Sequence, residues 1–578
     1  MRPSPSYDKY PTVPISSASA RCAVGWERVL EQIGSDASRV LCVECYPGVY
    51  VEEVEHAFVQ ALRPAQVIRS SDCLKSPAEV RALLSPYLTD DPVFGRMNGI
   101  RVEDFFNPVK LAATRRLIGP TRALTLVIGT GAFLIAPHSD LLVYADLARW
   151  EIQLRQRRNE IPNLGADNQN ELASLKYKRA FFVDWRAADR LKKEVFASVD
   201  YFLYTNDRRE PKLVPGDVLR QALQAVVKGP FRVVPYFDPG PWGGEWMRQV
   251  CDLPQEAPNY AWCFDCVPEE SSLFLGFGNT RVEVPSINLV FFHPRELLGD
   301  AVHARFGTEF PIRFDFLDTM DGGHLSLQVH PLTEYIQDQF GMHYTQDESY
   351  YLLDAKDDAV VFLGLRENIQ PAAMLEALER AQRGNFPFPA EQFVNRWPAR
   401  KHEHFLIPAG TVHCSGKNCM VLEISATPYI FTFKLWDWDR LDLQGRPRPI
   451  HLEHGRRNIQ WHRTTEWVQR NLVNRVQLVA QGDGWREERT GLHESEFIET
   501  RRHWFSKRVE HDTRGGVNVL NLVEGPEALV ESPDHAFAPF VVHYAETFVV
   551  PAAVGQYAIR PTQGDECATI KAFVRVNP

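Results

Sequence analysis

The first third of the chain alternates short apolar runs with amphipathic stretches. The apolar runs are residues 39–46, 123–135, 140–147 and 199–206. Between them, residues 51–63 and 77–88 repeat apolar side chains at the spacing of one helix face. Strands that alternate with helices in this way usually pair in parallel, with the helices covering the sheet. The pattern therefore predicts a doubly wound α/β domain at residues 23–225.

After residue 226 the pattern changes to short strands, aromatic residues and turns, which predicts all-β structure. A helical stretch interrupts it at about residues 367–400, where the sequence includes PAAMLEALERAQRGN. We expect two β domains, at residues 226–455 and 456–578, with the helical insertion in the first. Residues 1–22 are polar and rich in Pro and Ser, which predicts a disordered tail.

Composition narrows the class of protein. The chain has 578 residues, 44% of them hydrophobic and 24% charged, as in ordinary globular proteins. A formal net charge of −10 argues against a general nucleic-acid binder, but it is compatible with a local basic pocket for a small anion. The sequence has no apolar run of the roughly 18 residues that cross a membrane, and its first residues do not resemble a signal peptide. We therefore expect a cytoplasmic protein.

Three segments carry candidate metal ligands. They are LSLQVHP at residues 325–331, QDESYYLLD at 346–354 and FLIPAGTVHCSG at 405–416. Gln328 and His330 are two residues apart on a predicted strand, so their side chains face the same side. Glu348 opens the next apolar run, and His413 follows a turn built from Pro and Gly. Two imidazole nitrogens and two oxygens suit a divalent ion, zinc first, with manganese, iron or cobalt as alternatives.

Each of these residues also has a structural interpretation when it is taken singly. A histidine at a strand end often caps or packs, Gln328 could satisfy a backbone group, and Glu348 could be a rim carboxylate. Their order and spacing favour a site. Pro408-x-Gly410-x-x-His413 matches the second cupin signature, and Gln328 stands where many cupins carry their first histidine.

Residues from about 230 to 455 resemble the type I phosphomannose isomerases, zinc enzymes of the cupin superfamily. The matching motifs, in the order of that family, are PWGGEWM, NYAWCFDCVPEESSL, FPIRFDFLD, LSLQVHP, DESYYLLD, IPAGTVH and LWDWDRLDLQGRPRPIHLE. The resemblance implies that both β domains are cupin barrels, the second with a fainter match. It also implies that Gln328, His330, Glu348 and His413 are the metal ligands.

The chain departs from that family at positions near the substrate. Asp315 and Gln346 stand where members carry lysines, and Ser415 stands where some carry a tyrosine, whereas Ser326 keeps the serine of the family. Lys434 replaces a catalytic arginine, which keeps the charge but loses the planar fork that binds two oxygens at once. The loss of two cations weakens recognition of a phosphate ester unless other residues compensate.

The resemblance implies Lys434 as the catalytic residue and Ser326 and Arg440 as substrate-binding residues. Lys401 and His402 are further candidates for the compensating cations. These roles are expectations, because the sequence does not place the side chains relative to the metal ligands.

The implied activity interconverts mannose 6-phosphate and fructose 6-phosphate through a cis-enediol. A metal ion polarises the carbonyl, and the charge of Lys434 stabilises the developing anion. The base is not identified: Glu423 matches a recurrent glutamate of the family, and a purely structural role for it is equally open.

The expected partner is a small sugar phosphate, with no nucleic acid or membrane, and the oligomeric state stays open. The alternatives are a non-catalytic or divergent cupin that binds a sugar or sugar phosphate, and an isomerase of a non-phosphorylated sugar.

Residues of about 25–225 resemble P-loop kinases of the uridine kinase and phosphoribulokinase type, on strand spacing and on residues 129–159. The place of the phosphate loop, after the first strand, reads YPGVYVEE. It keeps Gly48 but has no lysine and no magnesium-binding hydroxyl, and Glu52 and Glu53 add negative charge where phosphate would bind. The sequence predicts a kinase scaffold without kinase chemistry.

Arginines follow the strands of this domain. Arg155, Arg157 and Arg158 are predicted to form a solvated helix face, with a retained anion site as the alternative.

Overall fold

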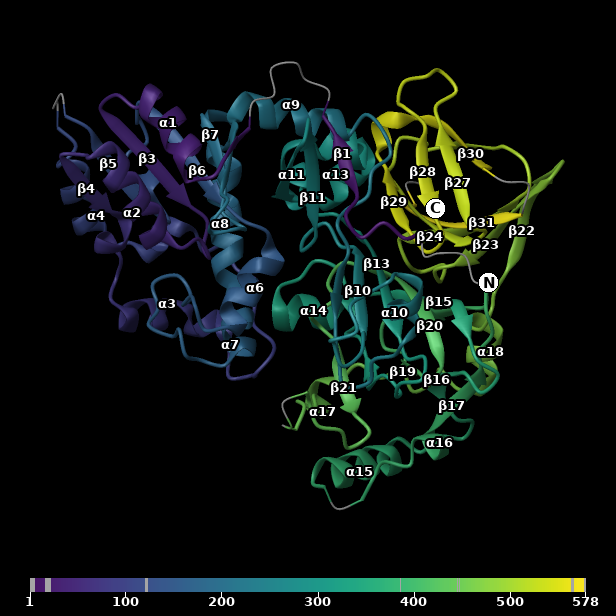
Figure 1. The fold of residues 1–578 in the computed structure, drawn as a ribbon. Coiled ribbons are helices and arrows are strands. Elements are labelled where there is room, and N and C mark those ends of the chain that lie inside the picture. Colours follow the sequence, from purple (N-terminus) through teal and green to yellow (C-terminus); the bar gives the residue numbers. More distant parts are fainter. Residues whose placement is uncertain are drawn as a thin grey trace. The chain divides into compact units, whose positions relative to one another are not determined.

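The structure, a computed structural model of the chain, describes residues 6–15, 22–119, 123–384, 386–443, 445, 447–562 and 566–575. The chain forms two compact units (Figure 1). Unit 1 comprises Met1–Pro11, Val226–Ser271 and His293–Pro578. Unit 2 comprises Thr12–Ala225 and Ser272–Phe292.

Unit 2 is built on a seven-stranded sheet with the order β2-β8-β7-β6-β3-β5-β4. Its strands are β2 (Ala23–Val24), β3 (Val40–Cys45), β4 (Gln66–Arg69), β5 (Thr125–Gly129), β6 (Leu141–Asp146), β7 (Tyr201–Tyr204) and β8 (Lys212–Pro215). The strands from β3 to β7 pair in parallel, and β8 is antiparallel to β7. Nearly every residue of β3, β5 and β6 is buried, as in a sheet that helices cover on both faces.

The connections between these strands are mostly helical, as the alternating pattern predicts. The helices of this unit are α1 (Trp26–Asp36), α2 (Val51–Leu62), α3 (Pro77–Leu88), α4 (Pro108–Arg115), α5 (Ala132–Ile135), α6 (Arg149–Arg157), α7 (Ala173–Arg179), α8 (Trp185–Val195) and α9 (Gly216–Val226). The start of α3 shows why the sequence folds this way. Ser76 accepts a hydrogen bond from the backbone N–H of Glu79, whose carboxylate accepts from Ser76 N, so two N–H groups at the helix end are satisfied.

A small second sheet in unit 2 revises the expected domain boundary. Its strands are β1 (Thr12–Pro14), β11 (Ser272–Phe277) and β12 (Thr280–Pro285), and α11 (Ile287–Phe292) follows them. β1 pairs in parallel with β11, which lies in a distant part of the chain. Residues 272–292 therefore belong with the α/β unit, although they follow the predicted boundary at residue 226.

Part of the predicted disordered tail is ordered. Residues 1–5 and 16–21 lie outside the described residues. Within unit 1, however, Tyr7 is buried and its hydroxyl donates to Asp265 at 2.5 Å, while Arg232 donates to the carbonyl of Asp8 at 2.9 Å. The prediction of disorder is wrong for this segment because a Pro- and Ser-rich composition does not reveal that one aromatic side chain is buried.

The turn after β3 is stabilised by hydrogen bonds of its own backbone and by Arg155. Val49 N–H donates to the carbonyl of Tyr46 at 3.1 Å, and the Gly48 carbonyl accepts from Arg155 Nη1 at 2.9 Å. The guanidinium of Arg155 also lies 3.9 Å from the centre of the Tyr50 ring. A phosphate-binding turn instead presents free N–H groups to its ligand.

Arg155 corrects the expectation of a solvated helix face. Its side chain is fully buried, pairs with Glu151 at 2.9 Å and donates to the carbonyl of Thr205 at 2.6 Å. A buried guanidinium needs such partners because its charge is otherwise costly to desolvate. Arg157 and Arg158 are exposed, as predicted.

The first β domain of unit 1 consists of two antiparallel sheets. The six-stranded sheet has the order β18-β15-β20-β13-β10-β9, and the five-stranded sheet has the order β17-β16-β19-β14-β21. The first contains β9 (Tyr236–Asp238), β10 (Trp262–Cys266), β13 (Ile312–Asp318), β15 (Glu348–Ala355), β18 (His404–Ile407) and β20 (Cys419–Ala426). The second contains β14 (Leu327–Val329), β16 (Val360–Leu365), β17 (Val394–Pro398), β19 (His413–Ser415) and β21 (Phe433–Trp436). This largely β architecture is consistent with a cupin-like fold.

The helical insertion is shorter than the predicted residues 367–400. It contains α15 (Pro371–Gln382) and α16 (Ala390–Phe393), after which β17 returns the chain to the five-stranded sheet. The other helices of unit 1 are α10 (Trp246–Val250), α12 (Pro294–Leu298), α13 (Asp300–Phe306), α14 (Thr333–Phe340), α17 (Leu452–Gly455) and α18 (Thr465–Asn471). Among the described residues, no helix combines the length and the hydropathy that crossing a membrane requires.

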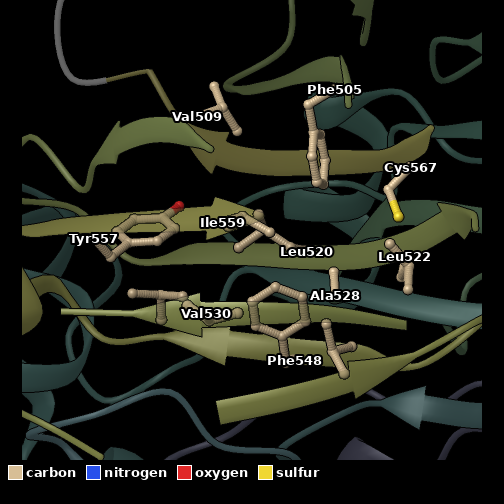
Figure 2. Packing of buried hydrophobic residues seen from close by; sticks show 12 residues of the cluster. Phe505, Val509, Leu520, Leu522, Ala528, Val530, Phe548, Tyr557, Ile559 and Cys567 are labelled. Atoms are coloured by element: carbon tan, nitrogen blue, oxygen red, sulfur yellow. The ribbon is translucent and has the colours of Figure 1, made fainter. Parts of the chain in front are cut away.

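The second β domain of unit 1 is a sandwich of a six-stranded and a four-stranded sheet. Their orders are β22-β23-β24-β31-β26-β29 and β25-β30-β27-β28. The strands are β22 (Gln477–Gly482), β23 (Trp485–Gly491), β24 (Ile498–Phe505), β25 (Val509–Asp512), β26 (Asn518–Glu524), β27 (Glu527–Glu531), β28 (Phe540–His543), β29 (Thr547–Val550), β30 (Gln556–Pro561) and β31 (Cys567–Val574). Side chains of both sheets meet in one apolar core, in which Phe505, Leu520 and Ile559 are fully buried (Figure 2).

We predict that Leu520→Ala destabilises this sandwich by about 2–5 kcal/mol, because the substitution leaves a cavity in the core. Leu478→Ala is the matched control, since Leu478 is 59% exposed, and we expect it to change stability by no more than about 0.5 kcal/mol. Hydrogen exchange of β26 measures the local opening free energy. Equal exchange in the two variants would contradict the assignment of this core.

Candidate metal centre

Three buried side chains converge between the two sheets of the first β domain. His330 lies one residue after β14, His413 opens β19 and Glu348 opens β15. Each offers a ligand atom, and these atoms all lie within 4.8 Å of one another. Glu348 Oε1 is 2.7 Å from His413 Nε2, and Glu348 Oε2 is 3.2 Å from His330 Nε2. The sheets therefore bring together three of the four predicted ligands.

Main-chain carbonyls hold the two imidazoles in one orientation. His413 Nδ1 is 2.8 Å from the Thr411 carbonyl, and His330 Nδ1 is 3.4 Å from the Phe431 carbonyl. A carbonyl oxygen only accepts, so each Nδ1 carries the proton and each Nε2 directs its lone pair at Glu348. Partners of this kind set the ligand nitrogen in metal sites.

Gln328, the fourth predicted ligand, joins the other three through the five-stranded sheet. It is the cross-strand partner of His413, and its amide Nε2 lies 3.3 Å from His413 Nε2. The amide of Gln328 presents its oxygen instead of its nitrogen after a half-turn of the side chain. It is therefore within reach of the ligands.

The donor set fits a divalent cation. His330 Nε2 and Glu348 Oε1 are buried and make no hydrogen bond within the described part of the chain. Buried lone pairs without a proton donor are unfavourable unless a cation binds them. Two imidazole nitrogens, a carboxylate and an amide oxygen are ligands that zinc accepts in tetrahedral sites and that other divalent transition metals share.

The electrostatics keep Glu348 ionised. Burial raises its pKa, but positive charge on the neighbouring His330 and His413 more than offsets this effect and holds the pKa of the carboxyl well below its usual range, and a cation bound at the same place would act in the same direction. An ionised carboxylate is the form that binds a metal ion.

The turn before β19 explains the position of His413. Gly410 has a φ of 86°, and a Cβ there would lie 2.8 Å from the Asn458 carbonyl and 2.9 Å from Leu332, so a side chain does not fit. Gly410 N–H donates to the His330 carbonyl at 3.0 Å, which ties the turn to the first ligand strand.

Arg463 supports the same turn and was not predicted from the sequence. Its guanidinium donates to the carbonyls of Pro408 and Ala409, both at 2.8 Å. No local motif reveals this residue, because it lies in a segment far downstream of the turn that it supports.

The two positions that carry lysines in the resembling family hold no cation. Gln346 Nε2 donates to Glu348 and Glu423, both at 3.2 Å. Asp315 pairs with Arg313 at 2.7 Å and is opposite Glu423 in the β13–β20 pair. Burial, partly offset by Arg313, raises the pKa of Asp315 to about 7. These residues form a buried, hydrogen-bonded acidic cluster beside the ligands.

Cations gather instead around Asp437. Its carboxylate accepts from Arg440 and Arg448, both at 2.6 Å, and from the Ser326 hydroxyl at 2.8 Å. Lys434, on β21, is the cross-strand partner of Gln328, so its side chain shares the face of that ligand. Burial and the nearby Arg448 lower the pKa of Lys434 to about 8. The predicted residues Ser326, Lys434 and Arg440 therefore lie in one cluster, together with Arg448, which sequence reasoning missed.

Lys401 and His402 do not belong to this cluster. Both contact Glu524 of the second β domain, at 2.5 Å and 2.9 Å. They are excluded as compensating cations because both side chains are already held by Glu524.

We predict that His413→Ala removes bound metal from the purified protein, because a carboxylate and one imidazole without the third strong ligand bind divalent ions weakly. His303→Ala is the control, since His303 lies on α13, outside the cluster of candidate ligands, and its Nδ1 is 2.8 Å from the local Gly307 carbonyl. Mass-spectrometric metal analysis gives the ion content per chain. Unchanged metal in His413→Ala would refute the ligand assignment.

The chain is homologous to mannose-6-phosphate isomerases over part of its length. It is 28% identical over 214 residues to the mannose-6-phosphate isomerase of Streptococcus mutans serotype c. This alignment covers 37% of this chain and 62% of that protein. It is 25% identical over 225 residues to the mannose-6-phosphate isomerase ManA of Bacillus subtilis, which covers 38% and 64%. The chain thus spans less than two thirds of the length of these relatives.

Two further comparisons concern a family model and a solved structure. Residues 25–228 match a family described as a domain of unknown function (DUF8485). The crystal structure of the mannose 6-phosphate isomerase from Bacillus subtilis is 18% identical with a TM-score of 0.49, and the match covers 60% of this chain and 99% of that one. The homology to mannose-6-phosphate isomerases rests on the sequence matches and covers about 38% of the chain.

Proposed function

We propose that the chain is a metal-dependent aldose–ketose isomerase that interconverts mannose 6-phosphate and fructose 6-phosphate. One observation carries the proposal: four ligand-type side chains converge next to a cluster of cations that the same sheet supports. The partial homology to mannose-6-phosphate isomerases supports it.

Gln328, His330, Glu348 and His413 would hold the ion, with zinc as the first choice. A bound divalent ion supplies a Lewis acid that polarises the sugar carbonyl and makes the adjacent carbon more acidic. Glu348 and the two imidazoles are fixed before substrate arrives, so little reorganisation is needed during the reaction.

The cluster around Asp437 would receive the charged part of the substrate. Arg440 and Arg448 carry two positive charges, of which Asp437 offsets one. The positive charge that remains attracts a phosphate ester, whose charge is about −1.5 to −2. Ser326 adds a hydroxyl next to the two guanidinium groups.

Lys434 would stabilise the anion that develops on the substrate oxygen during proton transfer. Its position opposite Gln328 puts its charge on the face that carries the metal ligands. Lysine supplies a point charge rather than the two-pronged contact of arginine. Glu423, bonded to Gln346 and Ser425, would position the acidic cluster rather than touch the substrate.

Exchange of the C2 proton of mannose 6-phosphate with solvent tests the activity. We predict that the metal-loaded protein catalyses this exchange and that Lys434→Met lowers kcat/KM by roughly 100- to 1000-fold, as when one preorganised charge contact is removed. Lys417→Met is the matched control, because Lys417 is exposed and pairs with Asp358.

Other outcomes separate the alternatives. Turnover of free mannose but not of its phosphate would favour an isomerase of a non-phosphorylated sugar. Binding of mannose 6-phosphate without any exchange would favour a non-catalytic cupin.

We further propose that unit 2 has the scaffold of a P-loop kinase without its chemistry. Arg155 donates a hydrogen bond to the Gly48 carbonyl in the turn after β3, and Glu53 at the start of α2 pairs with Arg208. A phosphate would meet carboxylates there rather than a lysine.

We predict that the full-length protein neither binds MgATP in a calorimetric titration nor hydrolyses it. Replacing Glu52 and Glu53 by Gln tests whether repulsion by these carboxylates is the only obstacle to binding. We expect no MgATP binding by this variant either, because removing the charge does not create the missing lysine and hydroxyl. Saturable MgATP binding by the unaltered chain would refute the prediction.

A further inference from the structure

The interior of the second β domain is apolar at one end and polar at the other. Along β24, Phe505 belongs to the apolar core, while His503, Arg501 and Glu499 follow it on the same face at every second position. On β25 the change occurs between Val509, in the core, and His511. The polar end surrounds a cavity of about 1030 Å³.

Several buried polar groups in this cavity have no partner of their own. Both ring nitrogens of His511 and Nδ1 of His503 are buried without a hydrogen bond among the described residues. The two rings lie close together, with centroids 4.5 Å apart, and the ring of His511 stacks on Tyr557. Native interiors leave few buried polar groups unsatisfied, so a group of them in one cavity indicates a ligand.

Lys571 adds a charge to the same cavity. It is 8% exposed and lies opposite Arg501 in the β24–β31 pair. Its ammonium makes no hydrogen bond or ion pair with any described residue, and its one ring contact is to Phe573. Burial lowers the pKa of Lys571 to about 8, which reflects how little the surrounding protein stabilises its charge.

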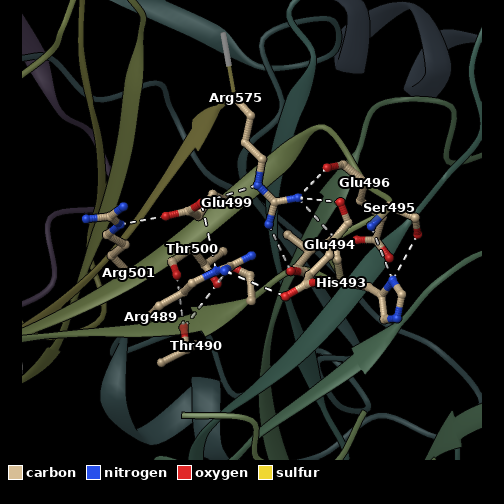
Figure 3. A network of polar contacts seen from close by, with 12 residues as sticks. Arg489, Thr490, His493, Glu494, Ser495, Glu496, Glu499, Thr500, Arg501 and Arg575 are labelled. Atoms are coloured by element: carbon tan, nitrogen blue, oxygen red, sulfur yellow. Dashed lines mark hydrogen bonds and ion pairs between the residues drawn. The ribbon is translucent and has the colours of Figure 1, made fainter. Parts of the chain in front are cut away.

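The inner part of the cavity carries more positive than negative charge. Among the buried and partly buried side chains of its lining, the cations are Arg489, Arg501, Lys571 and Arg575, and the carboxylates are Glu487 and Glu499. Figure 3 shows three of these arginines around Glu499. The carboxylates are thus already shared. Arg489 also contacts the exposed Glu494, and Arg575 donates to main-chain carbonyls, so Lys571 is the cation of this lining that the described residues leave open to a ligand.

We propose that this cavity is a second ligand site, separate from the metal centre, that binds a small polyhydroxylated anion of the size of a sugar acid or sugar phosphate. The anionic group contacts Lys571 and the two imidazoles at the inner end. Hydroxyl groups both donate and accept, so they suit a wall on which arginines and glutamates alternate. The cavity volume of about 1030 Å³ is slightly above the usual range of small-molecule sites, about 300–1000 Å³, so such an anion has room in it.

Calorimetric titration of the full-length protein tests the proposal, with gluconate and glucose 6-phosphate as probes. We expect saturable binding of at least one of them, and much weaker binding of glucose and of inorganic phosphate, which lack the charge and the hydroxyls respectively. Lys571→Met should weaken that binding roughly tenfold or more, the loss expected when a charge-assisted hydrogen bond is removed.

Three further variants make the test specific. His511→Phe keeps the ring stacked on Tyr557 but removes both nitrogens, so it should also weaken binding. Lys507→Met is the matched control, because Lys507 is exposed and pairs with Asp483 outside the cavity. Lys434→Met alters the first β domain and should leave the binding of gluconate unchanged.

Several results would overturn the proposal. They are no saturable binding of either probe, equal binding of glucose or inorganic phosphate, and binding that Lys434→Met abolishes while Lys571→Met and His511→Phe do not.

Discussion

The first β domain depends on one buried carboxylate held between two imidazoles. Main-chain carbonyls fix the Nδ1 protons of His330 and His413, so both Nε2 lone pairs point at Glu348. Such an arrangement is unfavourable by itself, because lone pairs face each other without a proton or cation between them. The turn at Gly410 and the support from Arg463 hold the arrangement in place, which makes sense if a cation binds there.

Charge is distributed unevenly around this centre, and the proposed recognition of an anionic substrate rests on that distribution. On one side, Asp315, Glu423 and Gln346 form a buried acidic and amide cluster in which Arg313 is the cation paired with Asp315. On the other side, Lys434 and two arginines surround Asp437. The positive side therefore favours an anionic group, although the lysines of the resembling family are absent. Asp315 and Gln346 stand where that family has lysines. Positive charge is nevertheless present near the centre, and Arg448 contributes part of it from a loop.

The convergence of the candidate ligands could be expected from the sequence, because their order matches that of a known family and because part of their placement depends on local geometry. Two side chains that are two residues apart on a strand face the same side, as expected for Gln328 and His330. The glycine turn before His413 sets the direction of that histidine. The remaining features depend on contacts between distant segments. Arg155 is buried and donates to carbonyls of distant segments, and β1 near the start of the chain pairs with β11 near its middle. Arg448 and Arg463 are found by no motif, since only the folded chain brings them to Asp437 and to the Pro408 turn.

X-ray absorption spectroscopy at the zinc edge of the zinc-loaded protein distinguishes this set of ligands from other sets. We expect nitrogen and oxygen ligands at about 2.0–2.2 Å, with the scattering pattern of two imidazole rings. The ten cysteines are free thiols, nine of them buried, so they offer an alternative set of ligands. A sulfur scatterer at about 2.3 Å, or the absence of imidazole scattering, would contradict the assignment of the metal to His330, Glu348 and His413.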